Sequence, residues 1–241
     1  RIPMPICFDL DGTLGSFGGG YLLLRRALAS LWGEEPGAEE LLACAGSTDW
    51  EIVAELHLAR FGRPLEEDHY DAYQAGCLVR FQAAFPEVPP AHQAFSGLVE
   101  ALGSLYTAGI PVAVVSGNAP RVLDFKLERL EIPPEVPRIG SRPRLDRADL
   151  LGLAGNRGPH LYLGDRPHDL EAARRAGIPF LGVGDRVPEA AFAVPATATE
   201  AEVLQWIERL DFVLSGKMHL AIAALGQGVP VACIAYQDKF E

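Results

Sequence analysis

ICFDLDGTL, residues 6–14, is an apolar run that ends in two aspartates one residue apart. A glycine and a threonine follow directly. Because like charges resist sharing a poorly solvated site, a positive group must lie beside or between these carboxylates. Asp9 and Asp11 therefore predict a charged site at the end of a buried strand, with partners supplied by other parts of the chain.

Short apolar runs of this kind recur and alternate with helix-length segments. The four runs are PICFDLD (5–11), IPVAVVSG (110–117), PHLYLGD (159–165) and IPFLGVG (178–184), and amphipathic stretches occur at 97–109 and 167–177. Runs that are apolar on both faces indicate parallel strands buried between helices. The alternation predicts an α/β fold with a doubly wound, Rossmann-like parallel sheet, in which ligands bind at the carboxyl ends of the strands.

Residues 20–94 interrupt this alternation, because they contain helical patterns and no segment that resembles a buried strand. Gly-rich and Pro-rich borders suit an inserted subdomain on short hinges. We therefore expect an α/β core formed by residues 1–17 and 95–209, and an α-helical cap at 18–94. Residues 210–241 form a βαβ tail.

Composition narrows the functional classes. The 241 residues are 49% hydrophobic, which supports a packed core, and the formal net charge is −11. So acidic a chain disfavours a nucleic-acid partner. No apolar run is long enough to cross a membrane. The four cysteines form no CxxC pair, so we expect free thiols and a cytoplasmic protein.

Three motifs follow expected strands in order: DLDGTL (9–14), VVSGN (114–118) and LGDRPHD (163–169). Over about residues 5–209 the chain closely resembles the haloacid dehalogenase-like superfamily, most nearly its phosphoglycolate-phosphatase-like branch with a helical cap. The resemblance implies a magnesium-dependent phosphatase that acts on a small phosphorylated metabolite, of the phosphoglycolate or sugar-phosphate type.

The chemistry of phosphate esters gives each aspartate a role. An attacking carboxylate is repelled by the phosphate dianion unless a metal neutralises the charge. Asp9 is the candidate nucleophile, which forms an aspartyl-phosphate, and Asp11 protonates the leaving oxygen and later activates water. Asp165 and Asp169 complete an oxygen-rich cage with Asp9 and Asp11, and such hard ligands suit Mg²⁺.

Phosphate binding is assigned to two other motifs. By resemblance Ser116 binds the phosphate, helped by exposed groups of Gly117 and Asn118, and Thr13 belongs to the same set and holds the turn. The third family motif carries a lysine before a proline, whereas this chain has GSRPRLD (140–146). Arg142 takes that place, and Lys126 is the competing candidate.

Substrate choice is expected in the cap. The loop AGSTDWEI (45–52) resembles the specificity loop of capped relatives, so Ser47, Thr48 and Asp49 could contact the leaving group, although Thr48 or Asp49 could equally cap a helix. A phosphomutase of the same fold is the nearest alternative. Phosphonate cleavage needs a cap lysine, and residues 15–94 contain none.

The segment 211–241 reads as strand, helix, strand and lies beyond the phosphatase resemblance. It resembles a fragment of the polysaccharide pyruvyl transferase family, which implies that Lys217 and His219 help hold an anionic donor such as phosphoenolpyruvate. Two interpretations stay open: a fusion to a transferase domain, or an added βαβ unit whose apolar strand needs a sheet edge or a second copy of the chain. A non-catalytic regulatory domain of such a bifunctional protein is the alternative from a different class.

Overall fold

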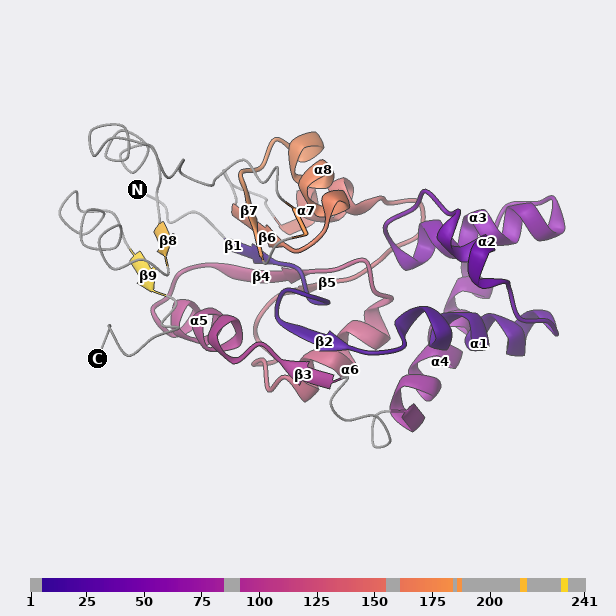
Figure 1. Ribbon diagram of the computed structural model, residues 1–241, viewed down its shortest axis with the longest axis horizontal. Coiled ribbons are helices and arrows are strands. Elements are labelled where there is room, and N and C mark those ends of the chain that lie inside the picture. Colours follow the sequence, from indigo (N-terminus) through magenta and orange to yellow (C-terminus); the bar gives the residue numbers. More distant parts are fainter. Residues whose placement is uncertain are drawn as a thin grey trace.

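Five parallel strands form the central sheet of the computed structural model, which describes residues 6–84, 92–154, 161–183, 186–187, 213–215 and 231–233 (Figure 1). The strand order is β5-β4-β1-β6-β7. The bounds are β1 Ile6–Phe8, β4 Val112–Val115, β5 Arg138–Ile139, β6 Leu161–Gly164 and β7 Phe180–Gly182. Strand β1 is central, because Ile6 pairs with Val112 on one side and with Leu161 on the other. The doubly wound parallel sheet expected from the sequence is confirmed.

Helices cover both faces of this sheet. Ile6 and Phe8 point to one face, where they pack in a cluster with α5 (Ser96–Thr107) and α6 (Pro120–Arg129). Cys7 points to the other face and packs with α7 (Arg147–Ala154) and α8 (Pro167–Ala176). Alternate residues of β1 are therefore buried in different layers, which explains why the strand is apolar throughout.

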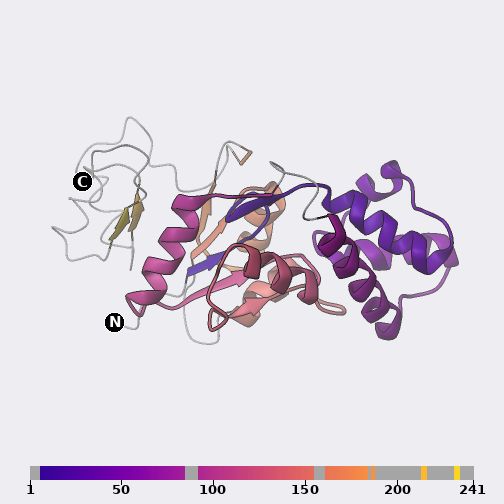
Figure 2. The same ribbon diagram turned by 90° about the horizontal axis from the view of Figure 1, so that it is seen from below.

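The segment between β2 (Gly15–Phe17) and β3 (His92–Ala94) forms a separate group of helices at one end of the molecule (Figure 2). These are α1 (Gly20–Trp32), α2 (Ala38–Leu42), α3 (Asp49–Phe61) and α4 (Glu67–Ala84). The chain enters and leaves this group through these two strands, which pair antiparallel. The helices agree with the sequence pattern, whereas the two paired strands were not expected.

The helical group shares its interior with the core. Its buried cluster contains Trp50 and Tyr70, and it continues onto Ala119, Val122 and Phe125 at α6. One hydrophobic cluster therefore joins the expected cap to a helix of the α/β core.

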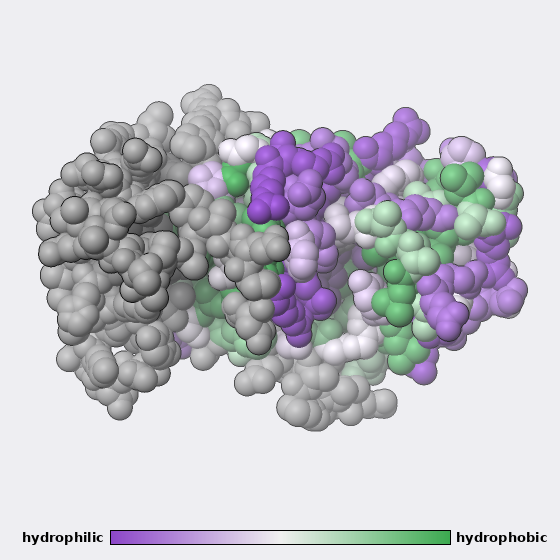
Figure 3. Space-filling model, turned by 45° about the horizontal axis from the view of Figure 1, so that its top comes forward, coloured by the Kyte–Doolittle hydropathy of each residue, from purple (hydrophilic) through white to green (hydrophobic). Residues whose placement is uncertain are grey.

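The tail contributes two short strands, β8 (Val213–Ser215) and β9 (Val231–Cys233), which pair parallel in a sheet of their own. The predicted helix between them, with Lys217 and His219, lies outside the described residues. None of the helices described is long and apolar enough to cross a bilayer. On the face in Figure 3, hydrophilic side chains gather at the middle of the molecule.

Candidate active site

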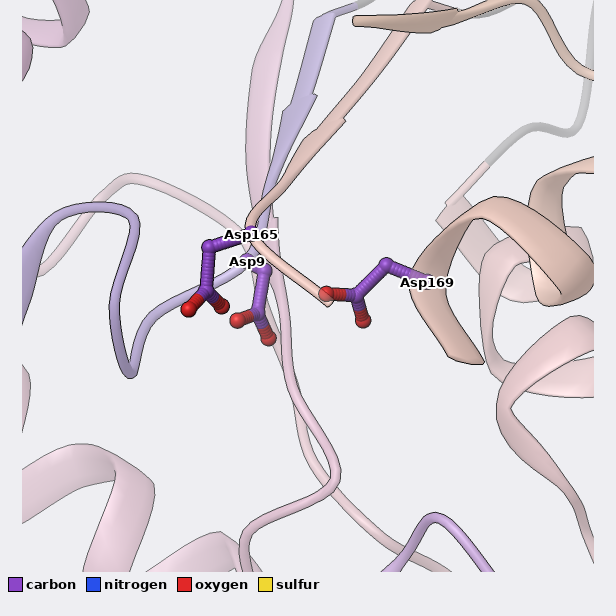
Figure 4. A group of neighbouring side chains, drawn as sticks. All are labelled: Asp9, Asp165 and Asp169. Atoms are coloured by element: carbon purple, nitrogen blue, oxygen red, sulfur yellow. The ribbon is translucent and has the colours of Figure 1, made fainter. Parts of the chain in front are cut away.

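Three aspartates meet at the carboxyl end of the sheet (Figure 4). Asp9 follows β1, Asp165 follows β6, and Asp169 lies in the first turn of α8. All three are buried, and one carboxylate oxygen from each lies within 4.8 Å of the other two. Motifs that are 156 residues apart in the chain, at Asp9 and Asp165, are thus brought into one group, as the sequence predicted.

The turn after Asp9 depends on a glycine. Gly12 has φ +92°, and a Cβ atom there would lie 2.1 Å from Oδ2 of Asp165. A side chain at this position would be strained and would also displace the aspartate. Thr13 differs from the expectation that it binds phosphate: its side chain is fully buried, away from the cleft, and its hydroxyl has no hydrogen-bond partner among the described residues.

Arg147, the first residue of α7, supplies the positive charge that the carboxylates need. Its Nη1 atom donates to Asp9 Oδ1 at 3.0 Å, to Asp169 Oδ1 at 2.5 Å and to the Tyr162 hydroxyl at 3.2 Å. The sequence favoured Arg142 instead, but that side chain is exposed and does not reach the group. The reason for the correction is geometric, since Arg142 lies in the loop before α7, whereas Arg147 opens the helix beside Asp9.

Burial dominates the electrostatics of the group. Burial and the neighbouring Asp169 raise the pKa of Asp9 well above its ordinary value, and Arg147 only partly opposes this. Burial also raises the pKa of Asp165. Asp165 Oδ2 accepts from Arg186 at 3.0 Å, while its buried Oδ1 has no hydrogen-bond partner among the described residues. The negative charge of these carboxylates is therefore only partly compensated, and a further cation would stabilise it.

Magnesium fits this group of ligands. Three carboxylates with hard oxygen donors lie close together, and the unpartnered Oδ1 of Asp165 is a donor that a cation would satisfy. Arg147 already donates to Asp9 Oδ1 and Asp169 Oδ1, and Arg166 N donates to Asp169 Oδ2, so a bound ion would use the lone pairs that these hydrogen bonds leave.

Asp11 belongs to a second polar group, with Lys126, Asn118 and Ser116. Lys126, which is 2% exposed, donates to both Asp11 oxygens at 2.9 and 2.8 Å and to Asn118 Oδ1 at 2.8 Å. Asn118 Nδ2 donates to Asp11 Oδ2 at 2.6 Å and to Ser116 Oγ at 2.7 Å. Lys126 is thus a buried member of the site and not a surface residue of α6, and it contacts Asp11 instead of Asp9.

The cap loop lies against these motifs. Asp49 N donates to Gly117 O at 2.7 Å, and Ala119 N donates to Asp49 Oδ2 at 2.8 Å. Arg147 Nη2 donates to Ser47 O at 3.0 Å. Thr48 is the N-cap of α3, and its Oγ1 accepts from Glu51 N at 3.3 Å. Thr48 therefore has the capping role that the sequence left open, while Asp49 bonds the backbone at the start of α6.

A cavity of about 340 Å³ opens between core and cap. Its lining includes Asp9, Asp11 and Arg147. Other residues predicted for the site also line it: Ser47, Thr48, Asp49, Ser116, Gly117, Asn118 and Lys126. Asp165 and Asp169 are not among the residues that line it. His168 does line it, and burial lowers the pKa of its imidazole to about 4.

A parallel sheet with carboxylates clustered at its strand ends and a helical insertion beside them is typical of hydrolases that have a Rossmann-like core and a cap. The chain belongs to the haloacid dehalogenase-like hydrolase family, whose profile matches residues 6–177. The family resemblance inferred from the motifs is thereby confirmed.

Solved structures share this fold. A hydrolase from Pseudomonas syringae is 16% identical with a TM-score of 0.57, and the match covers 75% of this chain and 84% of that one. CbbY from Rhodobacter sphaeroides, in complex with xylulose-(1,5)bisphosphate, is 21% identical with a TM-score of 0.56, over 80% and 91% of the chains. A "predicted phosphatase" from Clostridium acetobutylicum is 18% identical with a TM-score of 0.55, over 79% and 92%.

A second profile, that of the polysaccharide pyruvyl transferase family, matches residues 158–238. It overlaps the hydrolase match at 158–177, which includes Asp165 and Asp169. The tail resemblance thus has support from the profile, which extends it into the core. No curated protein matches the chain.

Proposed function

We propose that this chain is a magnesium-dependent phosphatase that hydrolyses a small phosphorylated metabolite through a phosphorylated Asp9. The observation that carries the proposal is the position of Asp9. It is buried beside Asp165 and Asp169 and accepts a hydrogen bond from Arg147. It also lines a cavity whose lining includes Asp11. A nucleophile, a proton-transfer group and a cation are therefore available around one space of substrate size.

The proposed reaction has two steps that use the same residues. A carboxylate oxygen of Asp9 forms a bond to phosphorus while the bond from phosphorus to the alcohol oxygen breaks, and Asp11 gives that oxygen a proton. Asp11 then takes a proton from water, which attacks phosphorus, releases inorganic phosphate and restores Asp9. Ser116 and Arg147 line the cavity where they can hold phosphate oxygens.

When bound by Asp9, Asp165 and Asp169, magnesium would neutralise charge on the carboxylates and on the phosphate. The residues of the chain already do part of this. Arg147 compensates Asp9 and Asp169, and Lys126 with Asn118 keeps Asp11 in place. Burial raises the pKa of Asp9 and Arg147 opposes this only in part, so a further cation beside Asp9 would favour its nucleophilic carboxylate form.

The test is release of inorganic phosphate from a panel of sugar phosphates and phosphoglycolate, with magnesium and with a chelator. Asp9→Asn should lower kcat by about 1000-fold or more, because an amide cannot act as the nucleophile. Asp68→Asn, an exposed acid at the start of α4, is the matched control and should stay within about twofold of the wild type. Equal turnover by Asp9→Asn would overturn the proposal, and transfer of phosphate within a sugar would favour the phosphomutase.

A second candidate rests on the transferase profile at residues 158–238. In it, the chain is a regulatory part of a protein that modifies glycans, and the tail binds an anionic donor. Calorimetric titration with phosphoenolpyruvate tests this: binding together with a folded chain that releases no phosphate from the panel or from p-nitrophenyl phosphate would favour the regulatory role. For the phosphatase itself we propose a cytoplasmic location, supported by the free thiols of Cys7, Cys44 and Cys77.

A further inference from the structure

The cavity between core and cap has two walls of different chemistry. The core wall carries positive side chains, Lys126, Arg147 and Arg166. Each of them has a carboxylate partner: Lys126 pairs with Asp11 at 2.8 Å, Arg147 with Asp169 at 2.5 Å, and Arg166 with Asp165 at 3.3 Å. Each of these cations is therefore already paired with an aspartate of the proposed catalytic site.

The opposite wall comes from the hinge strand β2 and the cap. Its side chains are mainly apolar or aromatic, among them Phe17, Leu24, Ile52 and Phe81. Phe17 and Phe81 also face Lys126, whose Nζ lies 5.1 and 4.8 Å from their ring centroids. Among the described residues 15–84 that line the cavity, none is Lys, Arg or His.

The charge that this wall does carry is negative. Asp49 lines the cavity, and its carboxylate accepts from Ala119 N at the start of α6. Lys126 lies over the two phenylalanine rings, but it already donates to Asp11 and Asn118. A substrate carboxylate or second phosphate placed against the cap would therefore lose water without gaining an unpaired cation, and would face Asp49 and Asp11. Hydrocarbon placed against the same wall would pack on Leu24, Ile52 and the two phenylalanines.

We infer that the substrate is a phosphate monoester whose alcohol carries no negative charge and has an apolar part. This inference rests on the proposed phosphatase function and narrows it. It excludes phosphoglycolate, whose alcohol bears a carboxylate, and sugar bisphosphates, whose second phosphate would meet the same wall. The restriction follows from the cap, because the core wall binds the phosphoryl group that all candidates share.

A matched pair of esters tests the inference. Benzyl phosphate and 4-carboxybenzyl phosphate have the same reacting atoms and differ by one carboxylate at the far end. We expect kcat/KM to be about tenfold or more higher for benzyl phosphate. The added carboxylate would be unpaired at the cap wall and would lie near carboxylates of the same charge. Equal or faster cleavage of the carboxylated ester by the wild type would overturn the inference.

A charge added to the cap wall should change this preference in a defined way. Tyr21 lines the cavity and is 58% exposed, so its substitution spares the buried core. Tyr21→Arg should narrow the ratio between the two esters by raising kcat/KM for the carboxylated one. Tyr21→Gln removes the ring without adding charge and should leave that ratio near the wild-type value. A similar change of the ratio in both variants would count against the electrostatic reason.

Direct binding separates this inference from the proposed function. If the wild type cleaves neither ester nor p-nitrophenyl phosphate, the phosphatase proposal fails. Calorimetric titration of the Asp9→Asn variant then still measures the preference, because the substitution lies in the core wall and leaves the residues of the cap wall unchanged. Tighter binding of benzyl phosphate retains the inference about the ligand, and equal or weaker binding overturns it as well.

Discussion

Arg147 places one guanidinium group between two buried carboxylates. It is 7% exposed, and Asp9 and Asp169 are 4% and 0% exposed. Buried charges are tolerated when they are paired and hydrogen-bonded, and removal of one partner leaves the others uncompensated. Arg147 therefore acts on stability and on the reacting carboxylate at once, a combination that an exposed arginine five residues earlier cannot provide.

Arg147→Met and Arg142→Met should differ sharply. Arg147→Met should lower kcat for phosphate release by about 100-fold or more, because it removes the fixed cation beside Asp9. It should also cost about 3 kcal/mol of unfolding free energy, because two buried carboxylates lose their partner. Steady-state kinetics and urea denaturation measure both effects.

Arg142→Met is the control at an exposed site, and we expect kcat within about twofold and unfolding free energy within about 0.5 kcal/mol of the wild type. Arg147→Lys keeps a charge in a different geometry and should retain more stability than Arg147→Met. The opposite ranking of Arg142→Met and Arg147→Met would restore the assignment suggested by the third motif.

At the scale of elements, the sequence predicted those strands that present a continuous apolar run. Strands β1, β4, β6 and β7 all do so, and the structure contains each of them. Strand β5 has only two residues, and β2 is Gly15-Ser16-Phe17, so neither offers a periodic pattern. These two strands are defined by their partners in the folded chain: β5 pairs with β4, and β2 pairs with β3.

The residues of the candidate site also differ in how far the sequence predicts them. Asp9 and Asp165 were predictable because each follows an apolar strand, and parallel strands bring their carboxyl ends together. Arg147 was not, because the sequence marks only the start of α7, where Asp146 and Asp149 cap each other's backbone N–H groups, and not the direction in which the Arg147 side chain points. The inward position of Lys126 likewise depends on how α6 turns against the sheet.

Asp49 links the start of α3 in the cap to the start of α6 in the core, and its protonation should affect stability. Burial raises the pKa of Asp49 to about 6, against about 3.9 for an aspartate in an unfolded chain. Between these values the folded state holds a proton that the unfolded state has released. Stability contributed at this site therefore falls as pH rises from about 4 to 6, by at most about 3 kcal/mol.

Asp49→Asn removes this titration and keeps an oxygen that can accept the Ala119 N–H. We expect the unfolding free energy of the variant, relative to the wild type, to rise with pH across the window from 4 to 6 and then level off. Urea denaturation of both proteins at several pH values measures the difference. A difference that stays constant across the window would show that Asp49 does not bind the proton in the folded chain.

At the scale of the whole molecule, the question is whether core and cap are separate folding units. The proposed boundaries at 17/18 and 94/95 lie at the paired strands β2 and β3, which cross together between the two parts. The hydrophobic cluster of the cap continues onto Ala119, Val122 and Phe125 of the core. A domain whose hydrophobic core includes residues of a neighbouring domain is not expected to be stable alone.

Phe125→Ala should therefore destabilise cap and core together. Phe125 is 7% exposed, and its loss should cost about 3–4 kcal/mol of unfolding free energy. Trp32 and Trp50 report on the cap once Trp206, which lies outside the described residues, is replaced by Phe, while far-ultraviolet circular dichroism reports on all helices. In that background the two signals should share one urea midpoint, lowered equally by Phe125→Ala. Leu42→Ala, at a cap residue that is 74% exposed, should leave the midpoint nearly unchanged. A fluorescence transition that precedes the dichroism transition would instead show a cap that unfolds on its own, and the shared cluster would then be a docked surface between two independent domains.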